Sequence, residues 1–520
     1  MKKNILKLTL ATSLFALASC SDFLDTIPDN RIEVDSPDKI APLLVSAYPD
    51  RLPMLMGEMY SDNVMDNGGQ FDSSLLQEQL YLWKDPTDND DDGPYGLWEA
   101  CYKAIASANQ ALEGIEAMGN PSSLNAKKGE ALICRAYAHF LMANIFCMPY
   151  NPQTADRNLG IPYSIVTEEE VLVPHERGTL AQTYQRIEED IKNGLPLIDD
   201  ASYKVSKYHF NKKAANAFAA RFYLYYQKWD KVIEYADAAI GPNPATTLRH
   251  WAEDFGSLSL VSDVTSQYIS EKKTANLLIS TAFSESGYVT GAFDIYKRYN
   301  HGQEVYKHET MEVSGPWDIQ GGMVMASIIV SVQQKNPFPK ITTYFEYTDK
   351  SNGIGFAHTV VVPFTTDETI LCRAEAYLLG SQQNYAKALE DINNWIIYHS
   401  AGDNGKRLTL DDVNGFYDQL PYAPVTVNSV ADRSIKKKLN PEGFTVMPEQ
   451  ENLIQLILHL RRLEGLQEGM RWYDLKRYGI EFSHNRAGST PDVLKKDDPR
   501  RAVQLPQDVI NAGMQPNPRN

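Results

Sequence analysis

An acidic stretch, DNDDDGPYGLWE at residues 88–99, has the residue types and spacing of a calcium-binding loop. Its acids and one glycine match positions one, three, five, six and twelve of the EF-hand pattern, at Asp88, Asp90, Asp92, Gly93 and Glu99. Carboxylate oxygens at this spacing are the ligands that Ca²⁺ takes in that motif. The alternative is a solvated acidic turn in front of a helix that begins near Trp98. Both interpretations are compatible with the pattern.

A second group of residues has the chemistry for binding sugars. Sugar rings present apolar C–H faces between hydroxyl groups, so aromatic rings can stack on them while amides and carboxylates form hydrogen bonds. Exposed rings outside the helical patterns are the candidates for ligand binding, namely Tyr81, Trp83, Tyr95, Trp251, Tyr288, Tyr296, Tyr299 and Trp317. Trp317 stands out because it lies in the turn-rich segment SGPWDIQGG. The alternative for each ring is packing of its loop onto the protein body.

No catalytic motif stands out in the chain. It lacks the HExxH pair of zinc proteases, the GxSxG nucleophile turn and the glycine-rich phosphate loops. The run EGMRWYDLKR places Glu468, Arg471, Asp474 and Arg477 at intervals of three, which is typical of a structural ion-pair network on a helix. We therefore expect a binding protein rather than an enzyme, and no cofactor apart from the calcium considered above.

The net charge bears on the class of partner, and the positions of the cysteines bear on whether disulfides form. The formal net charge is -17 and the pI is near 5.1, which argues against a nucleic-acid partner. Four cysteines follow Cys20 in helical, apolar surroundings, at Cys101, Cys134, Cys147 and Cys372. We interpret them as buried free thiols, although a disulfide between two of them is compatible with an oxidising compartment.

The N-terminus has the pattern of a secretory signal peptide. Lys2, Lys3 and Lys7 form a basic start, and an apolar run over residues 5–17 ends in small residues before Cys20. LASC at residues 17–20 resembles the lipobox of bacterial lipoproteins, which implies cleavage before Cys20 and its acylation. No later stretch is apolar over the length needed to cross a bilayer.

Most segments outside residues 245–366 show the periodicity of an α-helix. Apolar and small residues recur at helical spacing over residues 98–118, 127–146, 211–227, 229–240, 367–379, 384–399 and 449–478. Successive segments form pairs that resemble tetratricopeptide repeats, although their intervals are irregular. Residues 245–366 differ, because they have no sustained helical period and contain the strand-like runs LLIST, SIIVSV and HTVVVPF. A loop-rich insertion of this length is usually functional.

Several motifs resemble the SusD/RagB family of Bacteroidetes lipoproteins. CSDFLDTIPDN follows the lipobox, and KGEALICRAYAHFLMANIF over residues 128–146 resembles the family's second long helix. RRLEGLQEGMRWYDLKRYG over residues 461–479 and INAGMQPNP over residues 510–518 are similar to its C-terminal motifs. The resemblance implies a mostly α, SusD-like fold, with tetratricopeptide-like helix pairs, long loops and minor β structure in the insertion.

The resemblance also implies a role and a location. We expect a lipid-anchored protein of the outer membrane, facing the cell exterior, that binds an oligosaccharide or polysaccharide and delivers it to a SusC-like TonB-dependent transporter. A peptide cargo, a lipid-anchored glycan hydrolase and an adhesive lipoprotein are the alternatives. The expected organisation is a signal peptide (1–19), a lipidated tether (20–36), an N-terminal helical part (37–244), a ligand-binding insertion (245–366) and a C-terminal helical part (367–520).

Overall fold

Helices are the main secondary structure of the fold. The structure is a computed structural model, and the residues it describes are 34–167, 175–258, 260–290, 297–317, 340–400, 406–486 and 488–519. One antiparallel sheet and a few short strands accompany the helices. The predicted mostly α fold is therefore confirmed. Within these residues, no helix combines the length and the apolar character that crossing a membrane requires.

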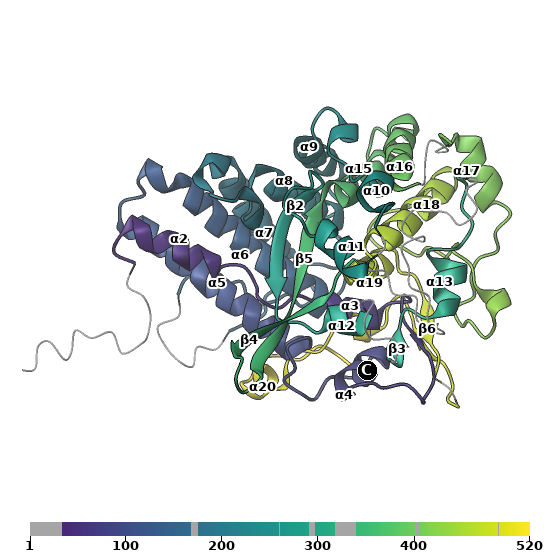
Figure 1. The fold of residues 1–520 in the computed structure, drawn as a ribbon, viewed down its shortest axis with the longest axis horizontal. Helices are drawn as coiled ribbons and strands as arrows, with labels where there is room; N and C mark the ends of the chain where they lie inside the picture. The colour runs from purple at the N-terminus through teal and green to yellow at the C-terminus, as the bar shows by residue number, and fades with distance from the viewer. Residues whose placement is uncertain are drawn as a thin grey trace, which may run out of the picture.

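Packed helix pairs form the N-terminal half of the molecule, at the left of Figure 1. α5 (Pro94–Ala117) packs on α6 (Asn125–Phe146), which also packs on α7 (Leu180–Gly194). The next pair is α8 (Lys212–Tyr225) and α9 (Trp229–Ile240). The corresponding helical periods in the sequence are confirmed to within a few residues.

Glycine and one buried ion pair set the spacing of α6 and α7. Gly129 lies against the backbone of Gly194, where an added Cβ would come within 2.7 Å of the carbonyl oxygen. Arg135 of α6 donates two hydrogen bonds to the carboxylate of Asp190 in α7, at 2.8 and 2.7 Å. A larger residue at position 129 would separate the two helices and weaken this pair.

The C-terminal half repeats the paired arrangement. α15 (Thr366–Leu379) packs on α16 (Tyr385–His399), on α9 of the preceding pair and on α18 (Pro448–Glu464). The predicted helical zone 449–478 is two helices, because Gly469 adopts a φ of +73° that favours glycine and breaks the run. The remaining helices of this half are α17 (Leu410–Tyr417), α19 (Met470–Arg477) and α20 (Gln507–Asn511).

The charged run at residues 468–477 joins several helices. Asp474 of α19 accepts hydrogen bonds from Arg461 of α18 and from Arg477, both at 2.9 Å. Arg477 also pairs with Glu375 of α15. The predicted structural ion-pair network is confirmed, but most of its partners lie on other helices rather than on neighbouring turns of the same one.

A three-stranded antiparallel sheet lies in the middle of the molecule, with the order β2-β5-β4. Its strands are β2 (Asn276–Ala282), β4 (Thr343–Asp349) and β5 (Ile354–Thr365). LLIST falls in β2 and HTVVVPF in β5, as predicted, whereas SIIVSV lies outside the described residues. The described part of the insertion also contains four short α-helices that the periodicity does not predict, because each spans about two turns or fewer: α10 (Trp251–Phe255), α11 (Val261–Tyr268), α12 (Ser286–Thr290) and α13 (Gln303–Glu309).

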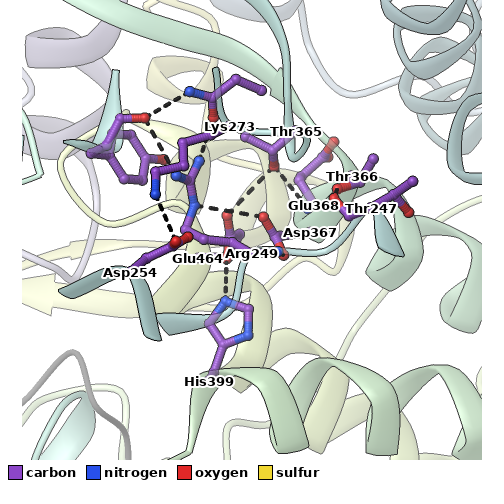
Figure 2. A network of polar contacts seen from close by, with 12 residues as sticks. Thr247, Arg249, Asp254, Lys273, Thr365, Thr366, Asp367, Glu368, His399 and Glu464 are labelled. Atoms are coloured by element: carbon purple, nitrogen blue, oxygen red, sulfur yellow. Dashed lines mark hydrogen bonds and ion pairs between the residues drawn. The ribbon is translucent and has the colours of Figure 1, made fainter. Parts of the chain in front are cut away.

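A buried polar network ties the start of this insertion to the helical body (Figure 2). The backbone N–H of Arg249 donates to Asp367 at the start of α15, at 3.0 Å. Glu464 of α18 accepts a hydrogen bond from Thr365 at 3.5 Å and lies 3.2 Å from Nε2 of His399 in α16. Because these groups come from four parts of the chain and are buried, they hold the insertion in one position.

Short helices and strands, most of them from the two ends of the chain, complete the fold. They are α2 (Pro37–Val45), α3 (Met54–Tyr60), α4 (Leu75–Tyr81), β1 (Met65–Asp66), β3 (Tyr299–Asn300), β6 (Phe482–His484) and β7 (Asp492–Leu494). β1 pairs with β3, and β6 pairs with β7.

The predicted free thiols are confirmed, since all four cysteines after Cys20 are buried and form no disulfide.

Candidate functional site

A cavity of about 290 Å³ lies where distant parts of the chain meet. Its walls come from residues 62–66, from α13 at residues 304–309, from the loop at residues 424–437, from residues 481–485 and from Tyr81 of α4. In Figure 1 these elements lie at the lower right, where purple α4 is beside teal β3 and yellow β6. No single segment of the sequence contains this site, because only the fold assembles it.

A stack of aromatic rings supports the cavity. Tyr81 lies parallel to His484, with ring centroids 4.2 Å apart, and it also stacks on Tyr299 at 4.4 Å. Trp83 stacks on His484 at 4.2 Å. The two ring nitrogens of His484 lie 2.5 and 3.0 Å from the carbonyl oxygens of Tyr81 and Ser61. The stack therefore joins α4, β3 and β6, each ring pair adding about 0.5–1.5 kcal/mol beyond simple burial.

An arginine lies over the ring at each end of this stack. The guanidinium of Arg298 is 5.0 Å from the centroid of Tyr299, and that of Arg500 is 5.6 Å from Trp83. Arg298 also donates two hydrogen bonds to Asp66 of β1, at 2.8 and 2.7 Å. Trp83 adopts a φ of +48°, which costs a residue with a Cβ about 1–2 kcal/mol. Its contacts in the stack offset that cost.

Glu309 of α13 is the centre of a buried charge cluster in the cavity wall. Its carboxylate accepts hydrogen bonds from Arg433 at 2.5 Å, Lys437 at 3.0 Å and Arg462 at 3.1 Å. Burial opposes ionisation, but the positive charges of Lys437 and Arg462 outweigh it and lower the pKa of Glu309 to about 2. The cluster therefore stays ionised and joins the loop at residues 424–437 to α13 and α18.

Asp62 forms a similar pair next to this cluster, since Arg462 of α18 contacts both Asp62 and Glu309. Arg471 donates to both of its carboxylate oxygens, at 2.8 and 3.0 Å, and Arg462 donates to its carbonyl oxygen at 2.7 Å. Burial again opposes ionisation, and the two arginines hold the pKa of Asp62 well below its ordinary value. Asp62, Asp66 and Glu309 in the cavity wall are thus each paired with arginine or lysine.

Solved structures share this fold over nearly the whole chain. A SusD superfamily protein from Bacteroides thetaiotaomicron has a TM-score of 0.63 over 94% of this chain and 100% of its own, at 17% identity. One from Bacteroides vulgatus has a TM-score of 0.60 over 93% and 98%, at 18% identity. A SusD-like carbohydrate binding protein from the same species has a TM-score of 0.60 over 91% and 96%, at 15% identity. At these identities, the similarity shows a shared fold.

The family follows from the sequence match that accompanies this fold. Residues 22–224 match the family model SusD-like_3, described as starch-binding associating with outer membrane. Over residues 22–224 the sequence is similar to the SusD-like family, and the fold of the whole chain is that of SusD superfamily proteins. No curated protein matches this SusD-like chain. The similarity to this family therefore rests on the N-terminal sequence match and on the fold of the whole chain.

The structure corrects the expectation that the candidate rings of this SusD-like protein are exposed. Five of them are no more than 2% exposed, namely Tyr81, Trp83, Trp251, Tyr299 and Trp317. Trp317 stacks on His459 of α18 at 5.8 Å, and Trp251 packs on Phe255 at 4.7 Å. Large rings bury the most apolar area, so the loops that carry them fold back onto the helical body. Tyr81 is the predicted ring that lines the cavity, and the other four cannot present a face to a sugar in this conformation.

The other three predicted rings have different positions. Tyr288 in α12 is 46% exposed, and the ammonium group of Lys297 lies 5.3 Å from its ring centroid. Tyr95 is half-buried in the first turn of α5. Neither ring lines the cavity. Tyr296 lies outside the described residues. A role for these three tyrosines in ligand binding stays a prediction.

The structure also contradicts the calcium interpretation of Asp88, Asp90, Asp92 and Glu99. Asp92 is buried and accepts hydrogen bonds from the hydroxyl of Ser284 at 2.5 Å and the N–H of Glu285 at 2.8 Å. Burial raises the pKa of Asp92 to about 7. Glu99 lies exposed in α5, and no cluster of three or more His, Cys, Asp or Glu suited to a metal occurs among the described residues.

The loop at residues 418–447 forms the outer rim of the cavity, and it was not predicted from the sequence to be part of a site. Val425 and Val430 of this loop are 37% and 47% exposed, and Tyr422 is 47% exposed. Asn428 lies between them and lines the cavity. The signal in the sequence is a proline-rich stretch between two helices that contains apolar residues without a helical or strand period.

Proposed function

We propose that this SusD/RagB protein is a cell-surface lipoprotein that binds an oligosaccharide or polysaccharide and delivers it to a TonB-dependent outer-membrane transporter. The description of the matching family as starch-binding and outer-membrane associated supports this role. A carbohydrate binding protein among the solved structures with this fold supports it as well. The observation that carries the proposal is the cavity assembled from loops on the rigid helical scaffold.

The chemistry of the cavity favours a neutral, hydroxyl-rich ligand. The inner acids Asp62, Asp66 and Glu309 are paired with arginine or lysine, so they offer little net charge to a ligand. The side-chain amide of Asn428 forms no hydrogen bond to any described residue and is exposed beside the apolar Val430. An amide next to an apolar side chain suits the hydroxyl groups and C–H faces of a sugar.

The same pairing favours binding over hydrolysis. A glycosidase needs a carboxylic acid whose pKa is raised so that it can protonate the leaving oxygen. The pKa values of Asp62 and Glu309 are instead lowered by the neighbouring arginines and lysine, against the effect of burial. We therefore propose capture without catalysis.

Membrane attachment is proposed to occur through Cys20, which lies outside the described residues. The described chain begins at Val34, whose side chain lies against Gly114 of α5. Acyl chains on Cys20 would anchor the protein without a spanning helix, facing the cell exterior. The transporter partner can be tested by purifying the tagged lipoprotein from detergent extracts of its native outer membrane. Absence of any co-purifying TonB-dependent barrel would contradict that part of the proposal.

Affinity gel electrophoresis tests the glycan proposal. The panel contains neutral polysaccharides (amylopectin, xylan, arabinan, galactan, mannan and laminarin) and the acidic polygalacturonate. We expect at least one neutral polysaccharide to retard the wild-type protein. The double substitution Asn428→Ala/Val430→Ala should abolish most of the retardation. Val45→Ala in α2, at a valine that is 67% exposed, is the matched control and should have no effect. Retardation by none of the polysaccharides, or equal retardation of both variants, would contradict the proposal.

A further inference from the structure

A second hollow lies beside the cavity and shares part of its wall. Its volume is about 720 Å³, and it is lined by residues 422–425, by residues 438–446 and by Glu451 in the first turn of α18. Pro424 and Val425 border both the cavity and this hollow. The two spaces therefore adjoin each other across these two apolar side chains.

Tyr422 is a fixed aromatic ring in this hollow. Its hydroxyl donates a hydrogen bond to the carboxylate of Glu451 at 2.5 Å. The ammonium group of Lys436 lies over the ring, 4.8 Å from the centroid, and donates to the carbonyl oxygen of Tyr417 at 2.8 Å. The ring is thus held at its hydroxyl end and on one face, while 47% of the residue stays accessible.

The backbone on either side of Tyr422 is also held in place. The N–H of Ala423 donates to the carbonyl oxygen of Lys436 at 2.8 Å, and the hydroxyl of Ser434 donates to that of Pro421 at 2.7 Å. A ring that is already immobilised loses little conformational entropy when a ligand stacks on it. Tyr422 is therefore preorganised for a stacking contact.

We infer that the hollow is a second sugar subsite, in which Tyr422 stacks on the part of a glycan chain that leaves the cavity across Pro424 and Val425. This inference rests on the proposed function of the cavity. A volume of about 290 Å³ is at the lower limit of ordinary ligand pockets, which are about 300–1,000 Å³. The cavity alone holds a short oligosaccharide, and the hollow provides room for its continuation.

The composition of the hollow fits a neutral sugar better than an apolar or strongly charged partner. Lys438 and Glu451 contribute one positive and one negative charge, and Thr445 adds a hydroxyl group beside the half-buried Phe444. An apolar partner would bury these charges without hydrogen bonds, which is unfavourable. Hydroxyl groups of a sugar can form hydrogen bonds with them while a ring face rests on Tyr422.

The test compares short and long fragments of the polysaccharide that retards the protein in the affinity gels. Isothermal titration calorimetry is carried out with a trisaccharide and an octasaccharide of that polysaccharide. Tyr422→Ala should weaken binding of the octasaccharide about five- to tenfold, the value of one aromatic stacking contact, and leave the trisaccharide unchanged. Tyr422→Phe keeps the ring and should retain most of the affinity for the octasaccharide.

Tyr208→Ala is the matched control, because Tyr208 is 52% exposed and lines neither space. Unchanged binding of the octasaccharide by Tyr422→Ala would overturn the second subsite and leave the proposed function standing. If Tyr422→Ala weakened binding of the trisaccharide and of the octasaccharide equally, the second subsite would also be overturned. Tyr422 would then affect binding by changing the conformation of the loop that lines the cavity. If no polysaccharide retards the wild-type protein, the proposed function fails and the subsite fails with it.

Discussion

The imidazole of His484 lies parallel to the phenol ring of Tyr81, with planes 3° apart and centroids separated by 4.2 Å. The two residues are 403 positions apart in the chain, yet this contact connects β6 near the C-terminus to α4 near the N-terminus. Together with Tyr299 and Trp83, they form the stack beside which the cavity lies. The proposed glycan site therefore depends on a contact between the two ends of the protein.

Removal of the central ring of this stack should destabilise the protein. His484→Ala deletes a fully buried ring and leaves a cavity between Tyr81 and Trp83. We expect the free energy of unfolding to fall by about 2–4 kcal/mol, measured by urea denaturation. His308→Ala in α13 is the control, because that side chain is 40% exposed. Equal stability of both variants would show that the stack contributes nothing.

The Glu309 cluster provides a second prediction. Glu309→Gln removes the negative charge that compensates Arg433, Lys437 and Arg462 in a buried position. We expect a loss of about 3–5 kcal/mol in the free energy of unfolding, because unpaired buried charges are costly. Glu304→Gln on the same helix is the control, since that carboxylate is 39% exposed beside His308. A Glu309→Gln variant as stable as the control would contradict the structural role of the cluster.

Asp92 should produce a pH-dependent difference in stability. Its pKa is about 7 in the folded protein, above its ordinary value of 3.8, so the folded state binds more protons than the unfolded state between these pH values. The free energy of unfolding of the wild type therefore decreases as pH rises through this window, by about 2–4 kcal/mol from this group. Asp92→Asn cannot ionise, so its stability relative to wild type should increase by this amount from pH 4 to pH 8.

The control for that experiment is Glu99→Gln, at an exposed position of α5. Its stability difference from wild type should stay constant over the same pH range. A constant difference for Asp92→Asn as well would show that the carboxyl of Asp92 does not titrate in the way its burial implies.

Calcium should have no specific effect on this protein. The carboxylate of Asp92 is engaged by Ser284 and Glu285, and the remaining acids of the loop do not converge on a common point. We expect the melting temperature measured by differential scanning calorimetry to be the same with millimolar calcium and with a chelator. A saturable rise in melting temperature with calcium would restore the calcium-loop interpretation.

The helices of this protein were predictable, but the identity of the buried rings was not. The helical period places α8, α9 and α15 to within two residues, because each depends on neighbours within a few turns. The short helices of the insertion were missed, since five to eight residues do not show a period. The domain boundaries proposed at residues 244 and 366 stay predictions, although the contact between Arg249 and Asp367 shows that the insertion is fastened to the helical body.

The sequence by itself determined the helix pairs, the lack of any apolar stretch after residue 17 that is long enough to cross a bilayer, and the resemblance to the SusD/RagB family. These properties are encoded by local spacing and by short motifs. Only the tertiary structure decided that Trp317 and Trp251 are buried and that Asp92 accepts a hydrogen bond from Ser284. It also decided that the loop with Tyr422 borders the cavity. Burial and pairing depend on contacts between residues hundreds of positions apart, and no local pattern records which surfaces meet.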